Sequence, residues 1–475
     1  MLLRPRNVIA LLTAVSISAL SSVSAQFNDQ TKQLAHDIFK QLIEINTTDS
    51  AGNVTMAAEA VAERFRQAGF PESDIQVIGP SERKKNLVVR LHGGGKRKPV
   101  LLMGHLDVVE ARREDWTTDP FHFVETDGYF YGRGTEDMKD GDAIMTTTLI
   151  QYHKEGYVPD RDIILALTAD EEGGDFNGVN WLLQNRRDLI SAEFVLNHDG
   201  GGILAVHGQP LMMEVDATEK LYADYTLTVK NAGGHSSRPV PDNAIYHLAE
   251  GLTRLARYQF PLELNNVTRA YYDGMAKVET GERARDMRAI LKDPPDMDAV
   301  ARLSADSIDN SLLHTTCVAT RLNAGHANNA LPQTAVAIVN CRIEPGHTPE
   351  EVRKQLESIV SDPKISVAYL ASTSGGPDRK AFPPPPLRSD LFDPLRKTVA
   401  EMWPHLPVIP TMATGASDAV YTNAAGMPTY AVSGEAIDRD DNRAHGQDER
   451  IRQDSFYRAL DFYHRFLKLL TSQGA

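Results

Sequence analysis

Apolar side chains in the N-terminal part of the chain alternate between helical spacing and short continuous runs. Recurrence at every third or fourth position predicts a helix, whereas a short apolar run bounded by polar or turn-forming residues predicts a buried strand. The predicted order is helix Thr31–Asn46, helix Met56–Gly69, strands Asp74–Ile78, Asn86–His92 and Val100–His105, helix Gly141–Glu155, strand Asp162–Thr168, helix Val179–Asn185 and strand Glu193–Asn197. Strands that alternate with helices favour an α/β fold with a mainly parallel sheet covered on both faces.

The pattern changes in the middle of the chain. Long alternating strands with intervening helices predict a separate α+β unit. Its elements are strand Leu221–Lys230, helix Asp242–Tyr258, strand Gln333–Ile343 and helix Pro349–Val360. The segment from about 260 to 310 is long and polar and carries no motif that we recognise.

After this unit the α/β pattern resumes. A stiff connector rich in glycine and proline is expected at 375–386. The elements that follow are helix Asp390–Met402, strand Thr429–Ser433 and helix Arg450–Leu470. We therefore expect one α/β domain built from residues 26–215 and 376–475, with an α+β domain inserted at 216–375.

Length and charge narrow the classes of protein. At 475 residues with 41% hydrophobic content, the chain exceeds the ~250–300 residues at which single cores stop growing, which supports two domains. The formal net charge is −14, from 50 Lys and Arg against 64 Asp and Glu. This acidity would repel phosphate backbones and anionic membranes, so we expect no nucleic-acid partner.

The N-terminus has the plan of a secretory signal peptide. Arg4 and Arg6 precede an apolar stretch, Val8–Leu20, and small residues ending at Ala25 follow. The stretch is shorter than the roughly 20 apolar residues that a membrane span needs. We expect a signal peptide at residues 1–25, cleavage after Ala25, and a secreted or periplasmic protein without a membrane partner.

The chain has two cysteines, Cys317 and Cys341, which are too few for a disulfide-stabilised scaffold and lack the spacing of a thiolate metal site. Export would permit a disulfide between them, since both lie in strand-like runs joined by a turn-rich segment. Two unpaired buried thiols are the alternative, and the sequence leaves the choice open.

Acidic residues and histidines gather where predicted strands end or helices begin. These residues are His105, Asp107, Asp137, Glu171, Glu172, Asp199 and, in a polar loop before the last helix, His445. Because the carboxyl ends of strands in an open α/β sheet meet at one crevice, we expect these side chains to lie close together. Each residue taken alone is more often a turn or surface residue, so the argument depends on their number.

Imidazole and carboxylate ligands without cysteine suit zinc or a similar divalent ion with an open coordination position. Two ions ~3.5–4 Å apart need one shared carboxylate and two further ligands each. Three acids and two histidines meet that requirement, so the sequence predicts two metal ions per subunit.

Seven motifs, in order, resemble the co-catalytic zinc exopeptidases, the family of aminoacylase, glutamate carboxypeptidase, succinyl-diaminopimelate desuccinylase and carboxypeptidase S. They are Gly104-His105-Leu106-Asp107-Val108, Tyr131-Gly132-Arg133-Gly134 through Asp137-Met138-Lys139, Asp170-Glu171-Glu172-Gly173-Gly174, Asp199-Gly200-Gly201, Gly233-Gly234-His235-Ser236, Asn329-Ala330-Leu331-Pro332 and His445-Gly446. The amino-acid sequence is most similar to the carboxypeptidase S branch, notably in Trp116 with Pro120-Phe121 ahead of Asp127-Gly128. The resemblance implies a zinc exopeptidase-like catalytic domain with an inserted lid and dimerisation domain.

The resemblance also implies the ligand assignment. Asp137 bridges two zinc ions, His105 and Asp199 complete one site, and Glu172 and His445 complete the other.

The resemblance gives the two neighbouring acids supporting roles. Asp107 would orient the imidazole of His105, as a carboxylate commonly does for a metal-bound histidine. Glu171 would be the general base that passes a proton from water to the leaving amine. A turn residue for Asp107 and a plain surface acid for Glu171 are the alternatives, and His198 is expected to be structural.

Residues of the inserted domain are implied to contact substrate. His235 would stabilise the oxyanion, often from the partner subunit of a homodimer formed through the lid domains. Asn329 and Arg342 would bind substrate, since a guanidinium can hold a free carboxylate in a bidentate grip. A salt bridge on a strand edge is the alternative for Arg342, and Asp418 resembles a position that supports the ligands.

The predicted function is that of a zinc-dependent exopeptidase that hydrolyses a terminal amide bond of peptides, with a carboxypeptidase as first choice. An N-acyl amino acid amidohydrolase or a dipeptidase is the alternative within the same chemistry. A non-catalytic binding protein would not need Glu171, and a serine hydrolase is disfavoured because the chain has no Gly-x-Ser-x-Gly motif.

Overall fold

The computed structural model describes residue 27 and residues 29–370 and 380–472. Its largest element is a ten-stranded sheet in the order β1-β2-β6-β3-β7-β17-β9-β8-β18, with β16 paired to β9. The strands are β1 (Ile75–Ser81), β2 (Lys84–Leu91), β3 (Val100–His105), β6 (Ile163–Thr168), β7 (Phe194–Asn197), β8 (Gly202–Val206), β9 (Gln209–Glu219), β16 (Val408–Ala413), β17 (Thr429–Ala431) and β18 (Ala436–Asp438). The central strands β6, β3, β7 and β17 are parallel, so their carboxyl ends open on one edge.

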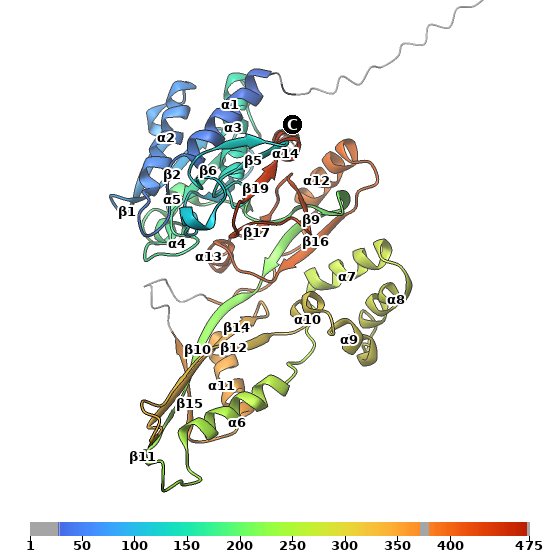
Figure 1. Ribbon diagram of the computed structural model, residues 1–475. Helices are drawn as coiled ribbons and strands as arrows, with labels where there is room; N and C mark the ends of the chain where they lie inside the picture. The colour runs from blue at the N-terminus through green and yellow to red at the C-terminus, as the bar shows by residue number, and fades with distance from the viewer. Residues whose placement is uncertain (1–26, 28, 371–379, 473–475) are drawn as a thin grey trace, which may run out of the picture.

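Helices cover both faces of this sheet (Figure 1). Leu102 and Leu165 pack into one apolar core, whereas their neighbours Leu101 and Ile164 pack into another on the opposite face. The helices on the first face are α1 (Asp29–Ile43), α2 (Val54–Gln67), α3 (Lys139–Lys154), α12 (Ser389–Met402) and α14 (Gln453–Leu470). Those on the second face include α4 (Gly178–Asn185) and α5 (Arg187–Ile190), with α13 (Ala419–Ala424) beside α4. The predicted α/β fold with a mainly parallel, doubly covered sheet is confirmed.

A second, four-stranded antiparallel sheet lies in the middle of the chain, in the order β12-β14-β10-β15. Its strands are β10 (Leu221–Lys230), β12 (Thr316–Ala324), β14 (Thr334–Ile343) and β15 (Ile365–Leu370), and its helices are α6 (Ala244–Arg257) and α11 (Pro349–Val360). Alternate residues of β10 pack into a separate apolar core with both helices. The short antiparallel pair β11 (Gly234–His235) and β13 (Ala330–Leu331) lies at the end of this unit farthest from the large sheet (Figure 1).

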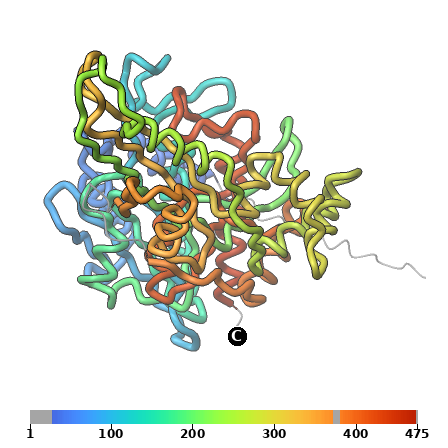
Figure 2. The backbone as a smooth tube through the Cα atoms, turned by 90° about the horizontal axis from the view of Figure 1, so that it is seen from below, coloured from blue at the N-terminus to red at the C-terminus, as the bar shows by residue number. Residues whose placement is uncertain are grey.

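The polar segment that carried no motif forms four helices. They are α7 (Asn266–Val278), α8 (Gly281–Ile290), α9 (Met297–Leu303) and α10 (Ser307–Leu313). Val267, Tyr272 and Met275 of α7 belong to the same apolar core as the large sheet, not to the core of the four-stranded sheet. Figure 2 shows these helices, in yellow, on the side of the molecule opposite α1 and α2.

The prediction from the sequence and the structure differ at the start of the last helix. Arg450–Arg452, expected to be helical, forms strand β19 in a small sheet with β5 (Tyr129–Tyr131) and β4 (Val124–Thr126). Arg450 packs on the Tyr129 ring at 4.0 Å from its centroid, so contacts with a segment distant in the chain decide the local structure. Two short 3-10 turns, η1 (Glu72–Asp74) and η2 (Arg113–Asp115), complete the elements described.

Cys317 and Cys341 form a disulfide, which settles the choice that the sequence left open. They face one another on neighbouring strands β12 and β14.

The predicted signal peptide, residues 1–25, lies outside the described residues, as does the first part of the predicted connector. In the part of the chain that the structure describes, none of the helices has the length and apolar character that crossing a bilayer requires.

Candidate metal centre

The residues predicted as metal ligands come from separate segments that meet at one edge of the large sheet. His105 ends β3, Glu171 and Glu172 follow β6, Asp199 follows β7, Asp137 precedes α3, and His445 lies in the loop before β19. The parallel order of β6, β3 and β7 brings the first three segments together.

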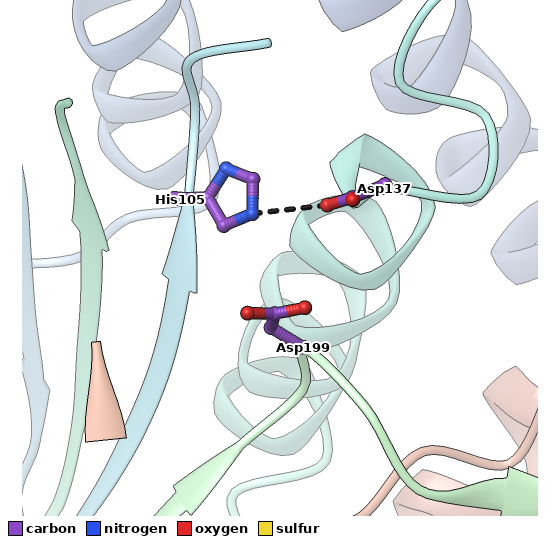
Figure 3. Close-up of side chains that lie close together, drawn as sticks. All are labelled: His105, Asp137 and Asp199. Atoms are coloured by element: carbon purple, nitrogen blue, oxygen red, sulfur yellow. Dashed lines mark ion pairs between the residues drawn. The ribbon is translucent and has the colours of Figure 1, made fainter. Parts of the chain in front are cut away.

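Asp137 lies at the centre of the cluster. Figure 3 shows it facing His105, whose Nε2 lies 3.1 Å from Asp137 Oδ1, with Asp199 beside them. On the other side, His445 Nε2 lies 3.0 Å from Asp137 Oδ2 and 2.8 Å from Glu172 Oε1. Ligand atoms of His105, Asp137 and Asp199 lie within 4.8 Å of one another, and so do those of Asp137, Glu172 and His445. Two three-residue groups therefore share one carboxylate.

The electrostatics of the cluster fit bound cations. His105 Nε2 and Asp137 Oδ1 are buried and face one another without hydrogen-bond geometry to any partner among the described residues. Burial raises the pKa of the Asp199 carboxyl to about 7, and the Asp137 carboxylate adds to the rise. Hydrogen bonds with Asp137 and Glu172 raise the pKa of His445 to about 10. The cluster thus favours positive charge, and its imidazole and carboxylate atoms fit zinc or a similar divalent ion.

Asp107 is buried beneath the cluster and connects two of its segments. His105 Nδ1 donates to the main-chain oxygen of Asp107 at 3.0 Å and lies 3.8 Å from its carboxylate. The carboxylate accepts the backbone N–H groups of Glu171 at 3.2 Å and Glu172 at 3.0 Å. Donation from Nδ1 leaves His105 Nε2 available to bind an ion. Asp107 therefore contacts the imidazole through its backbone and the N–H groups of the two glutamates through its side chain.

Glu171 also lies against the cluster, because its carboxylate is within 4.8 Å of ligand atoms of His105 and Glu172. Burial raises the pKa of Glu171 well above its ordinary value, and the effect of His105 opposes the rise. The side chain is consequently placed to accept and hold a proton beside the ligands.

Two further residues named from the sequence lie behind the cluster. Asp418 is buried and accepts hydrogen bonds from Thr168 Oγ1 at 3.2 Å and Asn177 Nδ2 at 2.6 Å. His198 is buried with its ring against Tyr463 and does not belong to the converging groups of the described residues. A cavity of about 190 Å³ opens next to Asp199, lined also by Thr218, Glu219 and Ser417.

Two of the predicted lid residues lie far from the cluster. His235 in β11 pairs with Ala330 in β13, and the backbone N–H of Ser236 donates to the main-chain oxygen of Asn329 at 3.0 Å. His235 and Asn329 thus lie together and exposed at the tip of the inserted unit, at the end opposite the large sheet (Figure 1). Within one chain the structure does not bring these residues to the cluster.

The third lid residue, Arg342, lies at the other end of the unit. It occupies β14 opposite Tyr222 of β10, close to where the chain leaves the large sheet at Glu219. Its guanidinium lies 4.8 Å from the centroid of the Tyr222 ring.

Sequence reasoning missed two buried charged residues that contact the ligand loops, Arg133 and Glu449. Arg133 stands inside a recognised motif and Glu449 follows His445 by four positions. Their closeness to these motifs could have drawn attention to both residues. Only the fold shows that the two side chains meet.

The model of peptidase family M20/M25/M40 matches residues 101–469, a stretch that contains all of the clustered residues. The chain belongs to this family. Members of the M20 family are metal-dependent peptidases, so the protein is a metal-dependent hydrolase of the peptidase and amidohydrolase type.

Curated relatives within the family differ in their named activities. The chain is 26% identical over 471 residues to the human N-fatty-acyl-amino acid synthase/hydrolase PM20D1, covering 94% of this chain and 90% of that protein. It is 27% identical over 383 residues to the probable carboxypeptidase S-like 2 of Dictyostelium discoideum, covering 78% of this chain and 71% of that protein.

Solved structures of M20 enzymes share the fold. An M20 family metallo-carboxypeptidase of Sulfolobus solfataricus superposes with a TM-score of 0.68 at 17% identity, covering 92% of this chain and 99% of that one. Human carnosine dipeptidase 1 superposes with a TM-score of 0.61 at 15% identity, covering 93% of this chain and 98% of that one. At these identities the likeness supports the two-part architecture alone.

Proposed function

We propose that this M20 enzyme is a di-zinc exopeptidase that releases the terminal residue of substrates with a free carboxylate, with peptides as the first substrate class. The observation that carries the proposal is the pair of ligand groups sharing Asp137, with the Glu171 carboxylate beside them. A shared carboxylate with two further ligands on each side is the arrangement that co-catalytic ions require.

In this proposal His105 and Asp199 hold one ion and Glu172 and His445 hold the other, with Asp137 common to both. The chemistry that two zinc ions supply at such a site is Lewis-acid activation of the scissile carbonyl and of water. The chain's contribution is to present these ligands at fixed spacing, which the backbone contacts of Asp107 support on the His105 side.

Glu171 is proposed as the general base. Its carboxylate takes a proton from the attacking water as the water oxygen bonds to the carbonyl carbon, and gives that proton to the leaving nitrogen as the C–N bond breaks. The position of Glu171 supports this shuttle, because its carboxylate lies within 4.8 Å of ligand atoms of His105 and Glu172.

Arg342 is proposed to anchor the substrate carboxylate. The guanidinium lies over the Tyr222 ring, whose hydroxyl donates to Asp224 Oδ2 at 2.7 Å. Asn340 Nδ2 donates to the other oxygen of Asp224 at 2.9 Å. This polar row lies on the sheet face opposite α6 and α11, and the Tyr222 ring supports a guanidinium that could bind a carboxylate in a bidentate manner.

We further propose a homodimer formed through the inserted unit. Edge strand β12 exposes Val318 at 60% and Leu322 at 65%, and an exposed apolar edge strand is a surface on which a second strand can pair. Dimerisation would allow His235 and Asn329, which lie at the far tip of their own chain, to reach the partner's site and stabilise the oxyanion there.

N-acyl amino acids are the second substrate class, favoured by the named activity of the human relative. These molecules also end in a free carboxylate, so the same role of Arg342 serves both. Export of the mature chain to the periplasm or cell exterior after removal of residues 1–25 remains part of the proposal.

The test is amino-acid release by the purified protein from matched substrates. The panel contains N-blocked dipeptides, the same dipeptides with an amidated C-terminus, free dipeptides, and N-acyl amino acids of short and long chain. We expect cleavage of the N-blocked peptides, loss of cleavage on amidation or chelation, and recovery with zinc.

Each outcome discriminates between substrate classes. Preference for N-acyl amino acids over N-blocked dipeptides would support the second class. Cleavage restricted to substrates with a free amine would overturn the carboxypeptidase assignment in favour of a dipeptidase. Arg342→Ala should raise KM by roughly ten-fold or more, because a charge-assisted hydrogen bond to the substrate is lost. The value of kcat should change little.

A further inference from the structure

A buried ion pair joins the two loops that carry Asp137 and His445. Arg133 is 2% exposed and Glu449 is fully buried, and Arg133 Nη1 donates to Glu449 Oε2 at 2.5 Å. Arg133 precedes Asp137 by four residues, and Glu449 follows His445 by four. The pair is thus adjacent to both ligands along the chain, although 316 residues separate its members.

Glu449 also holds the backbone that leads into the shared ligand. Its Oε1 accepts the N–H groups of Glu136 at 2.7 Å and Asp137 at 3.1 Å, and its Oε2 accepts that of Gly134 at 3.1 Å. The backbone of Glu449 accepts as well, because the N–H of Gly132 donates to its main-chain oxygen at 3.1 Å. A buried carboxylate with several N–H donors fixes the path of the loop, because losing the acceptor leaves the donors unsatisfied.

Arg133 secures the other loop. Its Nη2 donates to the main-chain oxygen of Gly446, the residue after His445, at 2.9 Å. The guanidinium also lies 5.0 Å from the centroid of the Trp116 ring. Since the His445 side chain is 53% exposed, the position of its loop depends on such backbone contacts more than on side-chain packing.

We propose that Glu449 and Arg133 are positioning residues that hold Asp137 and His445 at the spacing an ion shared between them requires. The inference rests on the proposed di-metal function. Neither residue belongs to the converging ligand groups, so both act through the loops that they join. Loops ordered before binding lose less conformational entropy when the ion arrives, which raises affinity.

Glu449→Gln tests this role, with Asp309→Asn as the matched control. Asp309 is likewise fully buried and accepts from Arg283 and from Tyr272, but it lies in α10, outside both ligand loops. Calorimetric titration of the metal-free proteins with zinc and amide hydrogen exchange over residues 132–137 are measured for each, together with thermal stability.

We expect Glu449→Gln to weaken binding of one of the two ions by about 10–100-fold, the range for removing a partner that orients metal ligands. The other ion should be affected less, since His105 and Asp199 lie outside the two loops. Exchange at residues 132–137 should accelerate in the metal-free variant. Asp309→Asn should lower thermal stability while zinc affinity and this exchange stay at wild-type values.

Arg133→Lys provides a second test that does not depend on Glu449→Gln folding. Lysine keeps a positive charge for Glu449 but lacks the two-nitrogen fork with which Arg133 contacts Glu449 and Gly446 together, so it should weaken the link between the loops while sparing the charge balance. We expect weaker binding of the same ion. Wild-type zinc affinity and exchange in both folded variants would overturn the positioning role.

The wild-type arm separates this inference from the proposed function. The di-metal proposal is overturned if the titration of the wild-type protein shows no stoichiometric binding of zinc. Unchanged exchange in the metal-free variants overturns the positioning role without reference to any ion.

Discussion

At the scale of single residues, environment gives similar side chains different roles. Glu171 and Glu172 are adjacent, and both donate a backbone N–H to the Asp107 carboxylate. Glu172 contacts His445, whereas burial raises the pKa of Glu171 well above its ordinary value. One glutamate is therefore suited to hold an ion and the other to carry a proton.

Replacing the proposed base should separate chemistry from metal binding. Glu171→Gln is expected to lower kcat by about 10²–10⁴-fold, the usual contribution of a general base, with zinc content unchanged. Steady-state kinetics and elemental analysis of the same sample check both parts. Glu172→Gln serves as the comparison and should lose zinc. Full residual activity in Glu171→Gln would rule out its role as base.

A partly buried acid away from the cluster should make stability depend on pH. Burial raises the pKa of Glu214 in β9 to about 8, and the neighbouring Asp216 carboxylate adds to the rise. The folded chain then binds more protons than the unfolded chain between pH 4.5 and pH 8. Protonated Glu214 contributes its full stability below pH 4.5. This contribution is lost as the pH rises through about 8.

Glu214→Gln removes this titration. The variant should gain stability over the wild type as pH rises from 5 to above 8, by on the order of 2 kcal/mol. Urea unfolding at a series of pH values measures the difference. Curves for the two proteins that stay parallel across the range would contradict the assignment.

At the scale of elements, register determines which side chains meet. Arg342 stands opposite Tyr222, and Cys317 opposite Cys341, because the pairing of β14 with β10 and β12 places them so. A shift of β14 by one residue would turn its side chains to the other face of the sheet and break both pairs. The disulfide joins edge strand β12 to its neighbour and thereby fixes that register.

Breaking the disulfide should destabilise the protein without affecting the metal centre. A cross-link over 24 residues is worth about 3 kcal/mol in the chain-entropy description. Reduction, or the double variant Cys317→Ala with Cys341→Ala, should lower the free energy of unfolding by that order. Zinc content should not change, because the ligands lie on the large sheet. Unfolding curves insensitive to reductant would show that the cross-link contributes nothing.

At the scale of the whole molecule, the two ends of the inserted unit differ in their relation to the cluster. Arg342 lies near the junction with the large sheet, whereas His235 lies at the opposite tip (Figure 1). Within a single chain, Arg342 therefore lies at the end of the inserted unit that adjoins the large sheet, and His235 does not. If His235 acts in catalysis, a partner chain must provide it.

Mixing two inactive variants tests this arrangement. Glu171→Gln and His235→Ala homodimers should each be nearly inactive. After subunit exchange, half of the dimers carry one intact site, so about a quarter of wild-type activity should return for a two-fold symmetric dimer. Activity assays before and after exchange, with mass measured by light scattering, give the result. No recovery in verified heterodimers would place His235 outside the partner's site.

The sequence by itself determined many of the elements and the residue types of the cluster. Periodicity placed α3, β3, β10 and α11 within a few residues of their observed bounds, because helix and strand spacing are local properties. It also placed His105 at the end of a strand, where a site in an α/β sheet is expected.

Only the tertiary structure decided which distant residues meet. The contact of Arg133 with Glu449, the packing of α7 on the large sheet and the remoteness of His235 from the cluster depend on segments far apart in the chain. Arg450–Arg452 became a strand for the same reason, since its partners Tyr129–Tyr131 lie over 300 residues earlier. Local patterns predict which face of a helix or strand is buried. The assembled fold decides which other element packs against that face.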